Sequence, residues 1–232
     1  MSENHVGLDT EDYESLKIEV ETLKARVAEL ESASKPEPAR VAKQKALFAV
    51  VTKIRESLDL DIIFKSTVRE VRQLLNADRV AIFQFYQDSG FDDGEFVSED
   101  VLPEFDSVKA VKVHDHCFGK QYSVRYQQGR IQAVNDIYQA GFSDCHIAVL
   151  AQFHVKANLV VPLIKGNELW GLVCIHQCRA PRQWQEDEIE FVTQIAVHLG
   201  VALQQAELLE KAQKRSTALQ TTLEAQFVKE CS

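Results

Sequence analysis

The sequence lacks the features that would suit nucleic acid or a membrane. Its 232 residues carry a formal net charge of −9, whereas recognition of nucleic acid requires a basic surface. The longest apolar run, "NLVVPLI", is far shorter than the roughly 20 residues that a membrane helix needs. The N-terminal stretch "MSENHVGLDTEDYE" is polar and acidic, without the apolar core of a secretory signal. We therefore expect a soluble, cytoplasmic protein.

The cysteines are too few for a disulfide-rich scaffold, and their number is odd. The five are Cys117, Cys145, Cys174, Cys178 and Cys231. An odd count without an export signal argues against a disulfide framework. Cys174 lies inside the apolar run "LWGLVCI" and is predicted to belong to the core, whereas Cys231 is predicted to be exposed and without function. Cys117 and Cys145 lie in polar clusters, where a cysteine is either reactive or incidental.

The N-terminal part of the chain has a heptad pattern. Apolar residues alternate at spacings of three and four, at Tyr13, Leu16, Val20, Leu23, Val27 and Leu30. This pattern predicts a coiled-coil helix of about three heptads, and the alternative is an amphipathic helix packed on its own domain. The prolines of "SASKPEPAR" then end the helix. We assign residues 1–44 to this helix and a linker.

From Lys45 onward the pattern predicts an α+β domain with a central antiparallel sheet. Amphipathic periodicity predicts helices over 46–58 and 61–75, and a short helix over 143–153 with Ser143 or Asp144 as its N-cap. Alternation of apolar residues predicts a strand over 79–85, with a partner over 94–102 across a turn rich in Gly and Asp. Further strands are predicted over 130–136, 157–164 and 169–177, the last two as a hairpin across "KGNE".

Two further segments complete the predicted organisation. Residues 103–129 have no clean period and are predicted to form a long excursion, which inside a compact domain is usually functional. A final helix is expected from Gln185 to near the end of the chain. We assign residues 45–205 to this α+β domain and 206–232 to a C-terminal helix.

Two clusters, "VKVHDHCFGK" and "FSDCHIAVL", place a cysteine beside histidine and aspartate. Cys145 falls in the first turn of a predicted helix, where the macrodipole and free amides favour a thiolate that could add to an electrophilic ligand. The alternative is a cysteine that only fills a helix start. Asp115 and His116 could tune the Cys117 thiol in either direction.

The clusters leave several chemistries open. A zinc site would use His114, His116 and Cys117, closed by Cys145 or His146, but the usual paired spacings are absent. A redox couple of Cys117 and Cys145, a catalytic nucleophile and a covalently bound cofactor are the other possibilities. The residues themselves do not choose between them.

A resemblance ranks these alternatives. "DHCF", residues 115–118, fits the Asp-Xaa-Cys-Phe motif of one subgroup of cyanobacteriochromes, which are GAF-domain bilin photoreceptors related to phytochromes. "CHIAVLAQFHVKANLVVPL" resembles their chromophore-attachment helix and the strand after it, and "LWGLVCIHQCRAPRQW" is similar to a hairpin and helix entry shared with phytochromes. The resemblance runs from about Leu47 to Gln205 and implies a GAF fold.

The resemblance implies roles for the residues of both clusters. Cys145 would form a permanent thioether to the A ring of a linear tetrapyrrole, with His146 against the pyrrole plane. Asp115 would face the pyrrole N–H groups, where a carboxylate can pair with a protonated bilin. Cys117 would add reversibly to the central methine carbon, which interrupts conjugation and shifts absorption to the blue. Phe118 completes the motif at the chromophore.

Other positions match residues that hold the rest of the pigment in this family. Arg125 and Tyr126 match positions that serve the propionates, Arg130 is a second candidate, and Asn158 could donate to a propionate as well. His176 takes the place of a histidine near the D ring. Without the resemblance, an arginine here would be a solvated charge and His176 a satisfied core residue.

The resemblance implies a photoreceptor that is not an enzyme. Its cofactor would be phycocyanobilin and/or phycoviolobilin, and it would switch reversibly between a blue-absorbing state and a green- to orange-absorbing state. The flanking helices would form a homodimer and pass the signal to a separate protein. Two rival functions remain: a GAF-type thiol redox enzyme or sensor that uses Cys117 and Cys145, and a small-ligand-binding adaptor.

Overall fold

The computed structural model describes residues 10–34, 38–57, 59–86 and 88–230 and divides the chain into two compact units, Met1–Ala42 and Lys43–Ser232. Cys231 lies outside the described residues, as does the side chain of Leu30. Helix α1 (Thr10–Ser34) covers the heptad pattern, and its side chains from Tyr13 to Val27 are exposed. Its pairing into a coiled coil stays a prediction, and so do the domain boundaries at residues 44 and 205.

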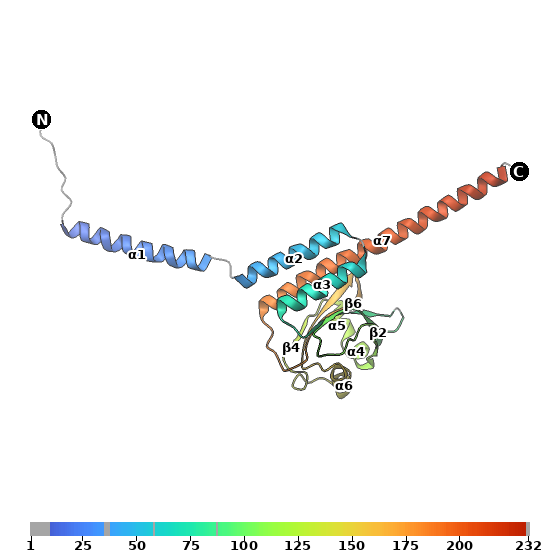
Figure 1. Ribbon diagram of the computed structural model, residues 1–232, viewed down its shortest axis with the longest axis horizontal. Coiled ribbons are helices and arrows are strands. Elements are labelled where there is room, and N and C mark those ends of the chain that lie inside the picture. Colours follow the sequence, from blue (N-terminus) through green and yellow to red (C-terminus); the bar gives the residue numbers. More distant parts are fainter. Residues whose placement is uncertain (1–9, 35–37, 58, 87, 231–232) are drawn as a thin grey trace. The chain divides into compact units, whose positions relative to one another are not determined.

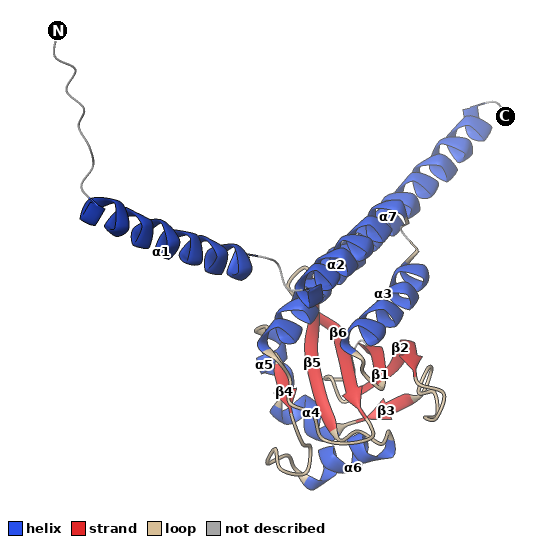
Figure 2. Cartoon of the chain, turned by 60° about the vertical axis from the view of Figure 1, so that its left-hand side comes forward, coloured by secondary structure: helices blue, strands red, loops and turns tan. Residues whose placement is uncertain are grey.

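The second unit is built on an antiparallel sheet whose described strands have the order β3-β2-β1-β6-β5-β4 (Figure 2). The strands are β1 (Arg79–Phe85), β2 (Asp93–Val101), β3 (Lys112–His114), β4 (Gln132–Val134), β5 (Ala157–Lys165) and β6 (Glu168–Gln177). The predicted α+β fold with a central antiparallel sheet is confirmed.

Helices cover both faces of this sheet (Figures 1 and 2). One face carries α2 (Pro38–Glu56), α3 (Leu60–Leu75) and α7 (Glu186–Glu230), and the other carries α4 (His116–Gln121), α5 (Ser123–Gln127) and α6 (Asp144–Gln152). Successive strand side chains point to opposite faces, so Val80 and Ile82 pack under α3 and α7 while Ala81 and Phe83 face α4 and α5. The sheet therefore separates two apolar clusters: the main core under α2, α3 and α7, and an aromatic-rich cluster under α4 and α5.

Local signals in the sequence set the ends of α3. The Asp59 side chain accepts hydrogen bonds from the backbone N–H groups of Asp61 and Ile62, which caps the helix start. Asn76 follows the last turn in the left-handed conformation, at φ 48°, and its N–H reaches the carbonyls of Arg72 and Gln73. The predicted helix over 61–75 is confirmed.

The long helix α7 approaches the sheet closely at one position. A Cβ added at Gly200 would overlap the backbone carbonyl oxygen of Ile164 in β5, so only glycine lets the helix and strand meet here. Beyond this contact, α7 continues as one helix to Glu230, with an exposed surface from Leu208 to Thr221. No helix in the described ranges is long and apolar enough to cross a membrane.

The structure corrects the prediction in the segment without a clean period. Residues 103–129 hold the short strand β3 and the short helices α4 and α5, which are too brief to produce a periodic pattern. The strand predicted over 130–136 shortens to Gln132–Val134, because only these residues pair with β5. Both corrections concern the elements that build the candidate site.

Candidate functional site

A largely apolar cavity lies between the sheet and the helices α4, α5 and α6. It contains about 650 Å³ of space free of atoms, its open mouth included. Seven aromatic side chains contribute to the wall: Phe83, Phe85, Phe91, Phe96, Phe118, Tyr126 and Phe153. The polar groups in the wall are few: Asp92, Asp115, Gln132, His146, Asn158 and His176.

Two short helices bring the cysteine clusters together at one side of this cavity. Asp115 caps α4 by accepting a hydrogen bond from the Phe118 N–H at 3.0 Å, which places Cys117 in the first turn. Ser143 precedes α6 as its N-cap residue, as predicted, but its hydroxyl lies 3.4 Å from Cys145 Sγ instead of capping the backbone. The structure thus places each cysteine near a helix start.

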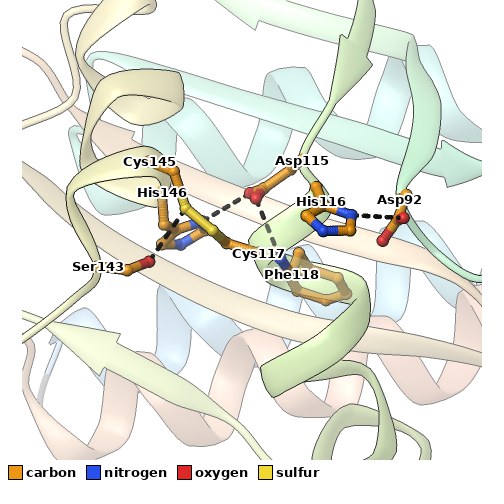
Figure 3. The surroundings of a disulfide bond; sticks show 8 residues. All are labelled: Asp92, Asp115, His116, Cys117, Phe118, Ser143, Cys145 and His146. Atoms are coloured by element: carbon orange, nitrogen blue, oxygen red, sulfur yellow. Dashed lines mark hydrogen bonds and ion pairs between the residues drawn. A yellow bond between two sulfur atoms is a disulfide. The ribbon is translucent and has the colours of Figure 1, made fainter.

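Cys117 and Cys145 form a disulfide bond, with their Cα atoms 6.6 Å apart (Figure 3). The sequence argues against a disulfide framework, and the pairing exists because the fold brings α4 and α6 together across 28 residues of sequence. The two sulfur atoms therefore meet at a single point beside the cavity.

A second contact joins the clusters. His146 Nδ1 lies 2.6 Å from Asp115 Oδ2, and only 12% and 13% of the two side chains are exposed. Phe142 packs edge-on against the His146 ring, with centroids 4.8 Å apart. Asp115 therefore accepts from the Phe118 N–H with one oxygen and contacts an imidazole with the other, while both side chains line the cavity (Figure 3).

The sheet side of the cavity carries buried polar atoms that lack a partner among the described residues. They are Oδ1 of Asn158 and Nδ1 of His176, which lie opposite each other in the β5–β6 register. Burial, helped by the nearby Arg79 guanidinium, lowers the pKa of His176 to about 3, so its imidazole is neutral at pH 7. Because a buried polar atom without a hydrogen bond is costly, these two atoms suit a polar ligand in the cavity.

Besides Asn158, the other three candidates for binding propionates occupy different positions. Tyr126 is buried in the cavity wall and donates a hydrogen bond to Gln132 Oε1 at 2.7 Å, and burial raises the pKa of its phenol. Arg125 is exposed and Arg130 is partly buried, and neither is among the residues that line the cavity. Arg130 Nη1 is nevertheless buried without a partner in the described chain.

Sequence reasoning missed part of the wall. Cys174, predicted to be core, faces the cavity from β6, and burial raises the pKa of its thiol to about 12, so it stays protonated. Strand alternation offers the signal that finds it, because Leu172, Cys174 and His176 must share one face of β6. Asp92 also lines the cavity, and nothing in its local sequence indicated this.

The histidines considered for zinc have other partners. His114 Nδ1 contacts Asp93 Oδ1 at 2.7 Å, and His116 Nδ1 contacts Asp92 Oδ2 at 3.1 Å. Across the part of the chain that the structure describes, no group of three or more His, Cys, Asp or Glu residues is arranged to hold a metal ion.

Comparisons with known proteins identify relatives of this chain. A putative methyl-accepting chemotaxis protein of Synechocystis is 38% identical over 157 residues. The blue-light absorbing form of the Thermosynechococcus elongatus PixJ GAF domain is 36% identical and covers 68% of this chain and 92% of its own, with a TM-score of 0.63. A phycocyanobilin-bound GAF domain from a cyanobacterial phytochrome is 27% identical, covers 72% and 96%, and has a TM-score of 0.65.

The curated relatives are much longer proteins. The chain spans 15% of the length of the chemotaxis protein, and 26% and 27% of two circadian input-output histidine kinases, CikA, from Thermosynechococcus and Synechocystis. The model of the GAF domain family matches residues 59–203, which include the sheet and both cysteine clusters. The chain belongs to the GAF domain family, and its structural neighbours include the GAF domains of cyanobacteriochromes and cyanobacterial phytochromes.

Proposed function

We propose that this chain is a photoreceptor that holds a linear tetrapyrrole in the cavity through Cys145 and switches reversibly when that pigment absorbs light. One observation carries the proposal: two cysteine sulfurs meet beside an aromatic cavity that presents unpartnered polar atoms from its floor. Two structural neighbours support it: one GAF domain in a blue-light absorbing form and one with phycocyanobilin bound.

The wall chemistry suits a flat, conjugated pigment with a few polar groups. The rings of Phe85 and Phe118 stack with their centroids 5.2 Å apart, and the centroids of the Tyr126 and Phe118 rings are also 5.2 Å apart. The pyrrole rings of the ligand therefore pack against aromatic side chains. Asp115 supplies the carboxylate that pairs with pyrrole N–H groups, and His146 supports it from the attachment helix. The neutral imidazole of His176 supplies a hydrogen bond to the carbonyl of the D ring.

When bound, the tetrapyrrole supplies the absorption of visible light and a methine double bond that isomerises. Cys145 adds its S–H across a double bond of the A-ring side chain, so sulfur bonds to carbon and the proton goes to the ring. Cys117 adds in the same sense to the central methine carbon, and its proton goes to a pyrrole nitrogen. No electrons are gained or lost in either step, so neither needs an oxidant or a reductant.

The finer features follow the same proposal. Reversible addition of Cys117 separates a blue-absorbing state from a green- to orange-absorbing state, with phycocyanobilin and/or phycoviolobilin as the pigment. The propionates are bound by Arg125, Tyr126, Arg130 and Asn158. Of the two arginines, Arg130 is the better candidate, because its Nη1 is buried without a hydrogen-bond partner among the described residues. The chain then acts as a sensor and not as an enzyme.

The signal leaves through the helices in this proposal. β6 carries His176 in the cavity wall, β5 pairs with it, and α7 touches β5 at Gly200 without room for a side chain. A shift of β5 and β6 is thereby transmitted to α7. A homodimer through the helices and a separate downstream protein are the proposed recipients.

Covalent loading tests the proposal. The full chain is produced with phycocyanobilin, denatured in acid urea and separated on a gel that reveals bound bilin by zinc-enhanced fluorescence. The wild type is expected to fluoresce, because a thioether survives denaturation. The fluorescence of Cys145→Ala is expected to be at least tenfold weaker than that of wild type. A matched control, Cys174→Ala, keeps the signal, since its buried thiol stays protonated. Equal fluorescence from wild type and Cys145→Ala contradicts the attachment site.

The disulfide favours a second candidate, a thiol redox sensor. In it, Cys117 and Cys145 cycle between two thiols and one disulfide, with a dithiol or glutathione disulfide as the exchange partner. The test is to equilibrate the pigment-free protein in glutathione buffers and to follow the pair by peptide mass spectrometry. A midpoint near a cytosolic glutathione potential, with no covalent bilin in the loading test, favours this function over the photoreceptor.

A further inference from the structure

The segment that carries Cys117 rests on the turn formed by residues 90–93. The Asp115 N–H donates to the Asp92 carbonyl oxygen at 2.7 Å, and β3 pairs with β2 directly before it, with His114 opposite Asp93. The turn is itself anchored, because the Phe91 ring packs edge-on against Phe85 at 5.2 Å in the aromatic cluster. The start of α4 is therefore held by a turn that is itself packed against the aromatic cluster.

The Asp92 side chain then contacts α4 on both sides of the cysteine. Its Oδ2 lies 3.1 Å from Nδ1 of His116, the residue directly before Cys117 (Figure 3). Its Oδ1 occupies the space where a Cβ at Gly119 would stand, so α4 packs directly on the carboxylate. Asp92 thus holds the helix turn that contains Cys117 by a polar contact and a steric one.

A neighbouring pair provides a contrast of the same chemistry. His114 Nδ1 and Asp93 Oδ1 are 2.7 Å apart, but 67% and 44% of the side chains are exposed, and both residues lie on the strand edge before α4 begins. His116 and Asp92 are 55% and 26% exposed, and only Asp92 of the two aspartates lines the cavity. The two histidine–aspartate pairs therefore differ in what they touch.

We propose that Asp92 is a positioning residue for Cys117: acting through His116 and Gly119, it fixes α4 so that the Cys117 sulfur reaches its reaction partner. For the loaded protein this rests on the proposed function, because the partner is then the central methine carbon. In the pigment-free protein the partner is the sulfur of Cys145, where the structure joins the two. The same positioning serves both bonds.

The pigment-free test uses disulfide closure as the measure of position. Reduced protein is equilibrated with a glutathione and glutathione disulfide buffer, which accepts the two electrons that Cys117 and Cys145 release. Asp92→Ala and His116→Ala are each expected to lower the equilibrium constant for the closed pair by roughly three- to tenfold, as for the loss of one partly exposed charged hydrogen bond. Asp92→Asn keeps an acceptor oxygen and is expected to have a closure constant between those of Asp92→Ala and wild type. The closure constant of His114→Ala is expected to stay within about twofold of wild type.

The loaded protein gives the second readout. The fraction of blue-absorbing state at photoequilibrium, measured per covalently bound bilin, is expected to fall in Asp92→Ala and His116→Ala but not in His114→Ala. Closure constants and blue fractions that match wild type in both variants overturn the inference. If wild type has no Cys117-dependent blue state while closure still depends on Asp92, the photoreceptor proposal fails and the positioning role stands.

Discussion

His146 and Asp115 join the two cysteine clusters, with Nδ1 and Oδ2 2.6 Å apart and both side chains mostly buried. The residue after Cys145 thereby contacts the carboxylate two residues before Cys117. That carboxylate also caps α4 through the Phe118 N–H. One aspartate therefore links the start of α4 to α6, and changes at this residue should affect both helices.

Removal of the Asp115 carboxylate tests this link. Asp115→Ala is expected to lower the free energy of unfolding by about 1–3 kcal/mol, because the helix loses its cap and His146 loses its partner. Urea unfolding of the pigment-free, reduced protein measures the change. Asp106→Ala, at an exposed position, is the matched control and should stay within about 0.5 kcal/mol of wild type. A loss no larger than that of the control contradicts the capping role.

His176 should make stability depend on pH. Its pKa is about 3 in the folded protein and about 6.5 when unfolded, so the unfolded chain binds the extra proton between these values. The contribution of His176 is therefore fully present above pH 6.5 and is lost as the pH falls, with a slope of up to about 1.4 kcal/mol per pH unit. Urea unfolding of wild type and His176→Gln from pH 7 to pH 5 measures it. Equal slopes for the two proteins would show that His176 does not titrate in this way.

The buried ion pair of Arg79 and Glu99 should be costly to break. Their side chains are 1% and 3% exposed and 2.8 Å apart, and Arg79 also donates to the carbonyl of Phe153, directly after α6. Glu99→Ala leaves the guanidinium buried without its partner and is expected to cost about 3–5 kcal/mol. The exposed pair of Lys214 and Glu210 is the comparison, since Glu210→Ala should cost less than about 1 kcal/mol in the same thermal or urea experiment.

The contact between α7 and β5 predicts the effect of a single added methyl group. Gly200→Ala places a Cβ on the Ile164 carbonyl oxygen, so the helix must move, at an expected cost of about 1–3 kcal/mol. Gln204→Ala lies exposed one turn later on the same helix and serves as the control. Retained stability in Gly200→Ala means that α7 does not depend on this close approach.

The parts predicted from sequence are those with long, regular patterns. The two apolar runs on either side of "KGNE" predict the β5–β6 hairpin, and amphipathic spacing predicts α3. The two polar clusters single out Cys117 and Cys145. The Asp115–His146 contact was not predicted, because 31 residues separate its partners and only the fold brings them together. The same holds for Asp92 and His116, whose 24-residue separation spans an irregular segment with no period. Short elements held by caps and neighbours leave little trace in composition.

The central claim, a light-driven switch at Cys117, is tested most directly by absorption spectra of the bilin-loaded chain before and after illumination. Wild type and Cys117→Ala are compared at equal covalent loading. The account predicts a reversible change in wild type between a blue band and a green to orange band, and no blue band in Cys117→Ala. A loaded wild type whose spectrum does not change with light, or a blue band that survives in Cys117→Ala, contradicts it.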